Sequence, residues 1–148
     1  MAPTISFQAS TLDEIRAHLF RAYPEEGCGF FFGKDGESRH VTHFLAAENV
    51  FEGDRKRRFS IRPADYLLAE QFALENGLDL LGIYHSHPNH PAIPSETDRT
   101  NAVPWFSYLI VTTTAAGPTL SRSWQLNEQG QFVEEVLVQS ETASTTWK

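Results

Sequence analysis

The segment from Asp79 to His85 limits the fold more than any other part of the chain. Its sequence, Asp-Leu-Leu-Gly-Ile-Tyr-His, carries large apolar side chains at both odd and even positions. A strand alternates its side chains between the two faces of a sheet, so this pattern predicts a central strand that is covered on both sides. Strands of this kind are typical of proteins in which helices pack on a sheet.

Three segments have the pattern of helices. Thr11 and Glu14 have the spacing of a capping box, and the apolar residues after Thr11 recur at helical spacing. Pro63 suits the first turn of a second helix, and Ser95 suits the cap of a third. The expected helices span residues 11–23, 63–76 and 95–102.

Apolar runs bounded by turn residues predict strands besides the central one. They span residues 27–33, 39–46, 57–61, 108–113, 120–126 and 132–138. Helices that alternate with strands at first, followed by a strand-rich C-terminal part, imply an α/β protein with a mixed sheet and helices packed on it. We expect a single domain over residues 1–148, because no linker or repeat interrupts it, with a core from about residue 5 to about residue 139 and a frayed tail over residues 140–148.

The composition excludes several classes of protein. Twelve Lys and Arg against nineteen Asp and Glu give a net charge of -7, which opposes sequence-independent binding to nucleic acid. No run approaches the ~18 to 20 apolar residues that cross a bilayer, and the N-terminus has no basic region followed by an apolar one. We therefore expect a cytoplasmic protein that binds neither nucleic acid nor membrane. Cys28 is the only cysteine, so any metal must be held by histidines and carboxylates.

A group of potential metal ligands follows the central strand. His85 and His87 are two residues apart, so on an extended segment both imidazoles point to the same side and can hold one ion. If Ser95 caps the next helix, Asp98 lies in its first turn, and the intervening loop is long enough to bring Asp98 back over the histidines. Two histidines and one aspartate leave the fourth position of a tetrahedral Zn²⁺ open for water, as in catalytic zinc sites.

Each part of this group also has an ordinary structural explanation. A His-x-His sequence alone is common at strand ends, and Ser-x-x-Asp alone is a capping box with an acidic first turn. The combination is more specific, because a buried strand, His-x-His-Pro, six residues and Ser-x-x-Asp fix five positions in one register. This combination favours a metal site.

The combined pattern resembles the signature of the JAMM (also MPN+ or JAB) zinc metalloproteases, which is His-x-His-Pro, six residues and Ser-x-x-Asp. Here the signature reads His85-Ser86-His87-Pro88, then residues 89–94, then Ser95-Glu96-Thr97-Asp98. The likeness extends from about residue 11 to about residue 132 and is to the small bacterial type, which includes peptidases of sulfur-carrier proteins. It implies a cytidine-deaminase-like α/β/α fold with a mixed, curved sheet, and one Zn²⁺ per chain held by His85, His87 and Asp98.

The resemblance also implies roles for other residues. Alignment on the Cys28-Gly29 pair places the family's catalytic glutamate at Glu26 rather than at Glu25. Ser95 would donate a hydrogen bond to the developing oxyanion. The basic run that contains Arg57 and Arg58 is either a solvated edge or a weaker candidate for substrate binding, through an acidic partner or a C-terminal carboxylate.

The implied function is zinc-dependent hydrolysis of the peptide or isopeptide bond after the C-terminal Gly-Gly of a ubiquitin-like or sulfur-carrier protein. The sequence does not fix the oligomeric state, and a homodimer is one option. One alternative is a metal-dependent deaminase of the same fold, which is disfavoured because the sequence has neither His-x-Glu nor Pro-Cys-x-x-Cys. The other alternative is a non-catalytic MPN-type interaction scaffold, which the presence of every expected site residue disfavours.

Overall fold

The computed structural model describes residues 2–141. In chain order its elements are β1 Thr4–Gln8, α1 Ala9–Ala22, β2 Cys28–Lys34, β3 Arg39–Ala47, α2 Pro63–Asn76, β4 Asp79–Pro88, α3 Glu96–Thr100, β5 Ser107–Thr114, β6 Gly117–Leu126 and β7 Phe132–Ser140. Within these residues no helix is long and apolar enough to cross a membrane.

The strands form one mixed sheet with the order β1-β3-β2-β4-β5-β6-β7, which closes into a barrel. β4, the predicted central strand, pairs antiparallel with β2 and parallel with β5. The barrel closes because β1 pairs in parallel with both β3 and β7. The predicted mixed sheet with flanking helices is confirmed, but its closure is a correction to the expected curved sheet, since we predicted no strand at residues 4–8.

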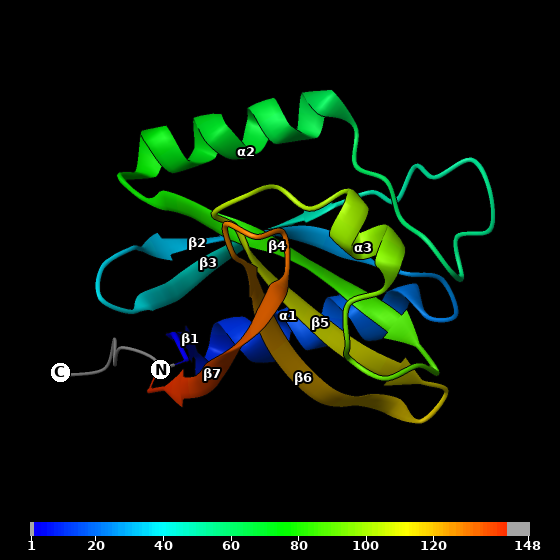
Figure 1. Cartoon of the computed structure of the whole chain (residues 1–148). Coiled ribbons are helices and arrows are strands. Elements are labelled where there is room, and N and C mark those ends of the chain that lie inside the picture. The colour runs from blue at the N-terminus through cyan, green and yellow to red at the C-terminus, as the bar shows by residue number, and fades with distance from the viewer. Residues whose placement is uncertain (1, 142–148) are drawn as a thin grey trace, which may run out of the picture.

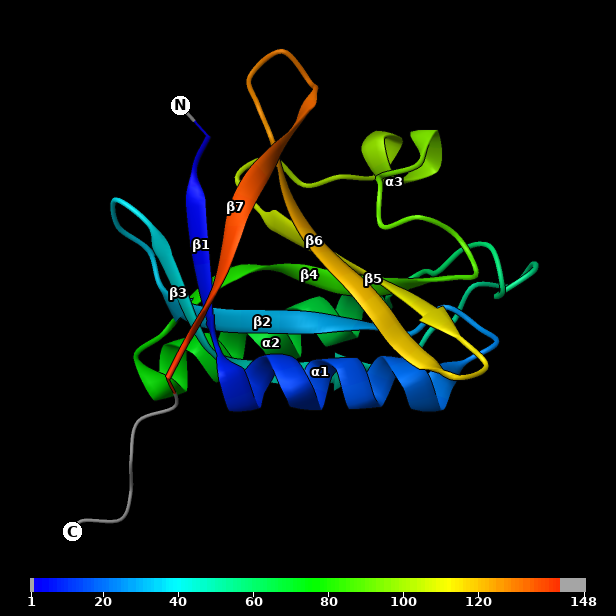
Figure 2. The ribbon, with the colours of Figure 1, turned by 90° about the horizontal axis from the view of Figure 1, so that it is seen from below.

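The two long helices lie on opposite sides of the sheet (Figure 1). Helix α1 packs against strands that include β1, β3, β5 and β6, whereas α2 packs against β4 (Figure 2). Neighbouring residues of β2 show how this arrangement divides the core. Phe31 contacts Phe7 on the α1 side, with ring centroids 5.2 Å apart, and Phe32 contacts Phe72 of α2 at 4.8 Å. The alternation of one strand therefore supplies two separate apolar cores.

The start of α1 differs from the prediction. The helix begins at Ala9, directly after β1, and its N-cap residue Gln8 makes no capping hydrogen bond through its side chain. Thr11 is buried inside the first turns, where its hydroxyl donates a hydrogen bond to the carbonyl of Thr42 at 2.9 Å. The predicted capping box of Thr11 and Glu14 is therefore wrong, because the threonine hydroxyl ties the helix to β3.

Other boundaries also differ. The strand predicted over residues 57–61 is wrong, since this segment belongs to a loop between β3 and α2. The predicted third helix is shorter and ends at Thr100. β4 continues to Pro88, so both histidines of the predicted site lie inside the strand. Of the tail predicted to fray, Ser140 belongs to β7, and residues 142–148 lie outside the described residues.

Candidate metal centre

Strand β4 delivers the two histidines to one side of the sheet. His85 and His87 alternate with Ser86, so both imidazoles lie on the face of the sheet that packs against α2. Their Nε2 atoms are 3.3 Å apart. Both side chains are buried. The ring of Phe59 stacks on the imidazole of His85, with centroids 4.6 Å apart and an interplanar angle of 28°. This packing holds the first imidazole in one orientation.

Helix α3 brings a carboxylate over the histidines. Its first turn is the predicted capping box: the Asp98 amide donates to Ser95 Oγ at 3.0 Å, and the Ser95 amide donates to Asp98 Oδ2 at 2.9 Å. The same Oδ2 lies 3.1 Å from Nε2 of His87 and 3.3 Å from Nε2 of His85. The cap of α3 therefore also fixes the carboxylate that faces the histidine pair.

The charge state of Asp98 suits a cation. Burial raises the pKa of this carboxyl, but the neighbouring His85, hydrogen bonds from both histidines and the Ser95 amide outweigh burial and hold the pKa below its usual value. The carboxylate consequently stays ionised over the physiological range. An ionised oxygen beside two imidazole nitrogens is a ligand set that zinc prefers.

The spacing of the three ligand atoms fits a tetrahedral ion. His85, His87 and Asp98 each offer one atom, and these atoms lie within 4.8 Å of one another. Bonds of about 2.0 to 2.1 Å to a tetrahedral Zn²⁺ would separate the ligand atoms by roughly 3.3 Å, which agrees with the 3.1 to 3.3 Å found here. Nδ1 of His87 lies 2.8 Å from the carbonyl of Pro91. A carbonyl only accepts, so Nδ1 is the donor in this contact, and release of the Nε2 proton would free Nε2 to bind a metal ion.

Glu26 lies beside this group, two residues before the start of β2. Its side chain is 5% exposed, and its Oε1 atom has no hydrogen-bond partner among residues 2–141. Burial raises the pKa of Glu26 to about 7, although the nearby His85 and His87 act in the opposite direction. A carboxylate that exchanges its proton near neutral pH is suited to general base chemistry. The adjacent Glu25 is exposed.

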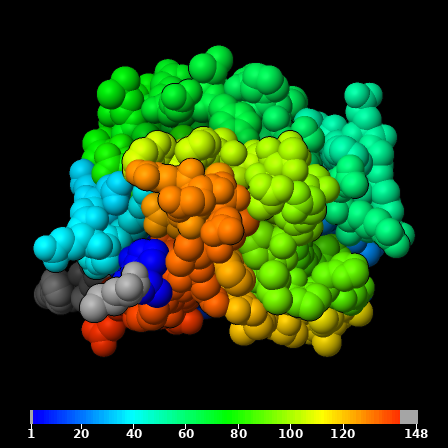
Figure 3. All heavy atoms as spheres, viewed as in Figure 1, coloured from blue at the N-terminus to red at the C-terminus, as the bar shows by residue number. Residues whose placement is uncertain are grey.

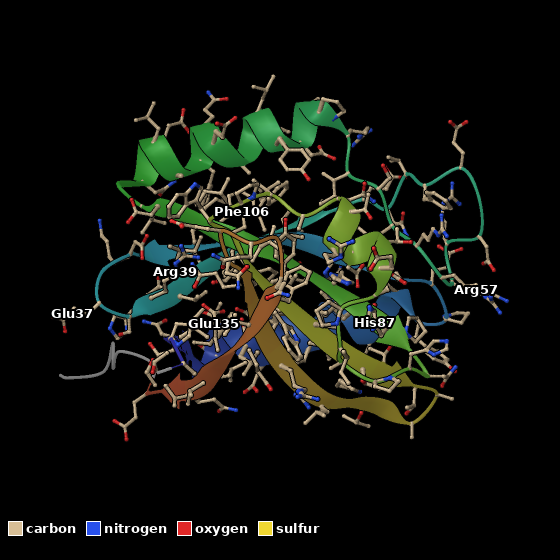
Figure 4. The ribbon with its side chains drawn as sticks, viewed as in Figure 1. Glu37, Arg39, Arg57, His87, Phe106 and Glu135 are labelled. Atoms are coloured by element: carbon tan, nitrogen blue, oxygen red, sulfur yellow. The ribbon has the colours of Figure 1, made fainter. Side chains whose placement is uncertain are left out.

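Two recesses flank the ligand atoms. Glu26, Ser95 and His87 line the first recess together with Arg57 and His90, whereas His85, Asp98 and Phe59 line the second together with Arg58. Arg57 lies on the long loop between β3 and α2, and His87 lies beneath α3 (Figure 4). In the space-filling view this loop stands next to the segment that carries α3 (Figure 3). Each predicted substrate-binding arginine thus borders one recess.

Three residues of the site were not found from the sequence. Phe59 stacks on His85, Ser86 accepts a hydrogen bond from the Gly27 amide at 2.9 Å, and Asn49 donates one to the Glu26 carbonyl at 2.9 Å. Only Ser86 carried a signal, namely its position between the two histidines. The contacts of the other two residues depend on how a loop without regular structure folds back on the site.

Residues 8–127 match the model of a family described as prokaryotic homologs of the JAB domain. The chain belongs to this JAB-domain family. The matched residues contain the three potential ligands, Glu26 and Ser95, so the resemblance found in the signature extends to the domain as a whole.

Relatives of this JAB-domain protein are known from bacteria and archaea. It is 39% identical to a Thermus thermophilus protein named "Probable TtuB-protein conjugate cleaving protease" over 87 residues. This match spans 59% of the present chain but only 55% of the Thermus protein. It is 28% identical over 128 residues to a desampylase of Haloferax volcanii, covering 84% of this chain and 90% of the relative. The solution structure of a protein from Desulfitobacterium hafniense has a TM-score of 0.81 and 31% identity over 94% of both chains.

Proposed function

We propose that this JAB-domain protein is a zinc metallopeptidase that hydrolyses the bond after the C-terminal Gly-Gly of a ubiquitin-like or sulfur-carrier protein. The observation that carries the proposal is the tetrahedral spacing of His85, His87 and Asp98 beside Glu26, a buried carboxylate whose pKa is raised to about 7. The names of two relatives, a conjugate cleaving protease and a desampylase, support cleavage of protein conjugates. A cytoplasmic location and a fold related to the cytidine deaminases are parts of the same proposal.

The residues around the ligands have distinct roles in this reaction. Bound zinc would supply an activated water and polarise the scissile carbonyl. Glu26 accepts a proton from the attacking water and delivers it to the leaving amine as the carbon–nitrogen bond breaks. Ser95 Oγ accepts a hydrogen bond from the Asp98 amide, and this bond does not use the hydroxyl proton. Ser95 therefore donates that proton to the oxyanion while it still caps α3.

The place of the ligand atoms favours a glycine-rich tail as substrate. The histidines are buried between a strand and a short helix, so an extended backbone reaches them most easily where side chains are missing. Arg57 and Arg58 each border a different recess and would attract acidic residues of the carrier or its leaving group.

Metal analysis tests the ligand set. The purified protein should bind one Zn²⁺ per chain, and His87→Ala should abolish tight binding, because two ligands hold zinc poorly. His90→Ala is the matched control, since His90 borders the same recess but is exposed, and it should retain the zinc. Full zinc occupancy in a His85→Ala, His87→Ala double variant would refute the assignment.

A cleavage assay tests the substrate. A carrier protein with a Gly-Gly-X tail should be cleaved faster than the same carrier with an Ala-Ala-X tail, and turnover should fall as salt rises. Arg57→Ala with Arg58→Ala should weaken the salt dependence, whereas Lys56→Ala, in the same loop, should not. Equal rates on both tails would reject the glycine requirement, and turnover that is independent of salt would reject the role of the arginines.

A further inference from the structure

We infer that Asn49 is a positioning residue that holds Glu26 in the orientation required for proton transfer. This inference rests on the function proposed above and assigns to Asn49 a role in the same site. Asn49 follows β3 and touches neither the ligand atoms nor the recesses. It acts through the backbone of Glu26 and through the loop between β3 and α2.

The side-chain amide of Asn49 makes four hydrogen bonds. Its Nδ2 donates to the carbonyl of Glu26 at 2.9 Å and to the carbonyl of Arg58 at 3.0 Å. Its Oδ1 accepts from the amide of Phe51 at 3.0 Å and from the amide of Ser60 at 3.1 Å. An asparagine amide has two donor hydrogens and one carbonyl acceptor with two lone pairs. Both donor hydrogens and both lone pairs of the Asn49 side chain are therefore used.

The loop also binds the other side of the Glu26 peptide. The Glu26 amide donates to the carbonyl of Arg55 at 2.7 Å. Both backbone groups of the catalytic glutamate are therefore held by residues 49–60, and its side-chain Oε1 is held by none of the described residues. The orientation of the carboxylate is consequently set through the backbone, and Asn49 is the residue that joins this backbone to the two ends of the loop.

The loop has no strand pairing that would replace these bonds. Residues 49–60 lie outside every helix and strand of residues 2–141, and Val50 and Ser60 share a single backbone hydrogen bond of 2.9 Å. The same loop carries Phe59, which stacks on His85. A shift of about 1 Å in a catalytic group is enough to lower a rate about 100-fold, so loss of the Asn49 amide should impair proton transfer.

Two variants separate the tether to Glu26 from the fold of the loop. Asn49→Asp keeps the acceptor oxygens for Phe51 and Ser60 but loses both donors, whereas Asn49→Ala loses all four bonds. Asn127→Ala is the matched control, because Oδ1 of Asn127 likewise accepts two backbone amides, from Gln129 and Gln131, in a distant turn. In the zinc-loaded protein, both Asn49 variants should lower kcat about 100-fold with KM changed less than about 3-fold, and Asn127→Ala should leave both unchanged.

A double-variant cycle shows whether Asn49 acts through Glu26. In a Glu26→Gln background, where general base catalysis is already lost, Asn49→Asp should cause no further loss of kcat. A purely structural role would lower the residual kcat of Glu26→Gln by the same ~100-fold factor as in the wild type, and this result would overturn the inference.

Hydrogen exchange provides a test that needs no activity. Asn49→Asp should increase exchange at the Glu26 amide at least about 10-fold, while the amides of Phe51 and Ser60 and zinc stoichiometry stay as in the wild type. Unchanged exchange at Glu26 would overturn the inference even in an active enzyme. If the wild type cleaves no conjugate, the proposed function fails, and the exchange result still decides whether Asn49 holds Glu26.

Discussion

Two adjacent glutamates just before β2 differ in their exposure to solvent. Glu26 is 5% exposed and lines a recess with His87, whereas Glu25 is exposed and donates its amide to the carbonyl of Ala22. The residues have the same chemistry and nearly the same place in the chain. Only their burial and their direction distinguish the proposed base from a solvated charge.

Exchange of each carboxylate for its neutral amide should reveal this difference. Glu26→Gln should keep one Zn²⁺ per chain and lose hydrolysis by ~10²- to 10⁴-fold, because the variant cannot accept a proton. Glu25→Gln should keep both zinc and activity. Metal analysis and steady-state kinetics on the two variants provide the comparison, and an active Glu26→Gln with an inactive Glu25→Gln would move the base by one residue.

Among the elements, β4 depends on a close approach to its neighbour. A Cβ added at Gly82 would lie 1.9 Å from the carbonyl oxygen of Ser107 on β5 and 2.6 Å from the ring of Phe31. Backbone and a buried ring cannot yield to such an atom. The glycine therefore allows β4 and β5 to pair at the spacing that places His85, three residues further along, beneath α3.

Gly82→Ala should accordingly lower the free energy of unfolding by roughly 1 to 3 kcal/mol, the usual cost of overpacking a core. Gly36→Ala is the control, since the nearest atom to its added Cβ is 3.7 Å away, and it should unfold within about 0.5 kcal/mol of the wild type. Denaturant titration of both variants measures the effect. A neutral Gly82→Ala would show that the two strands can separate without cost.

The elements also show what the sequence can predict. Alternation and apolar runs identified every strand except β1. The signature predicted that His85, His87 and Asp98 lie together, as the structure has them, because all three fall within 14 consecutive residues. β1 is short and its partners are distant in sequence, so no local pattern marks its pairing with β7. The same reason explains why Asn49 and Phe59 escaped detection, since their contacts are set by the path of a long loop.

At the scale of the whole molecule, a second buried carboxylate lies at the other end of the barrel from His87 (Figure 4). Glu135 of β7 accepts hydrogen bonds from Ser107 of β5 at 2.8 Å and from Ser123 of β6 at 2.7 Å. Arg39 of β3 donates to the same Ser107 hydroxyl at 2.8 Å. Burial raises the pKa of Glu135, although both serines and Arg39 oppose the rise.

This carboxylate should make stability depend on pH. As pH rises through the ordinary glutamate pKa, the unfolded chain releases a proton that folded Glu135 retains, so the free energy of unfolding falls until pH passes the raised pKa. Glu135→Gln should remove this fall, so the free energy of unfolding of the variant relative to the wild type should rise with pH until pH passes the raised pKa.

Glu134→Gln should change the pH dependence of the free energy of unfolding in the opposite direction. Arg122 donates to Glu134 and lowers its pKa, so its contribution to stability is present at neutral pH and is lost as pH falls through the lowered pKa. Thermal unfolding of the metal-free proteins from about pH 2.5 to pH 8 measures both effects, because the Glu134 contribution is lost below the ordinary glutamate pKa and the Glu135 contribution is lost above it. Parallel curves for Glu135→Gln and the wild type would contradict the assignment.

The parallel pairing of β1 with β7 has a consequence for synthesis on the ribosome. Thr4 and Val136 are partners although they lie far apart in the chain, so β7 is translated long after β1. At about 5 to 20 residues per second, synthesis from the end of β1 to the start of β7 takes roughly 6 to 25 seconds. One edge of β1 stays unpaired during this time, even after β3 has been made. The nascent chain thus carries an open strand edge, which can pair with other chains, until β7 emerges.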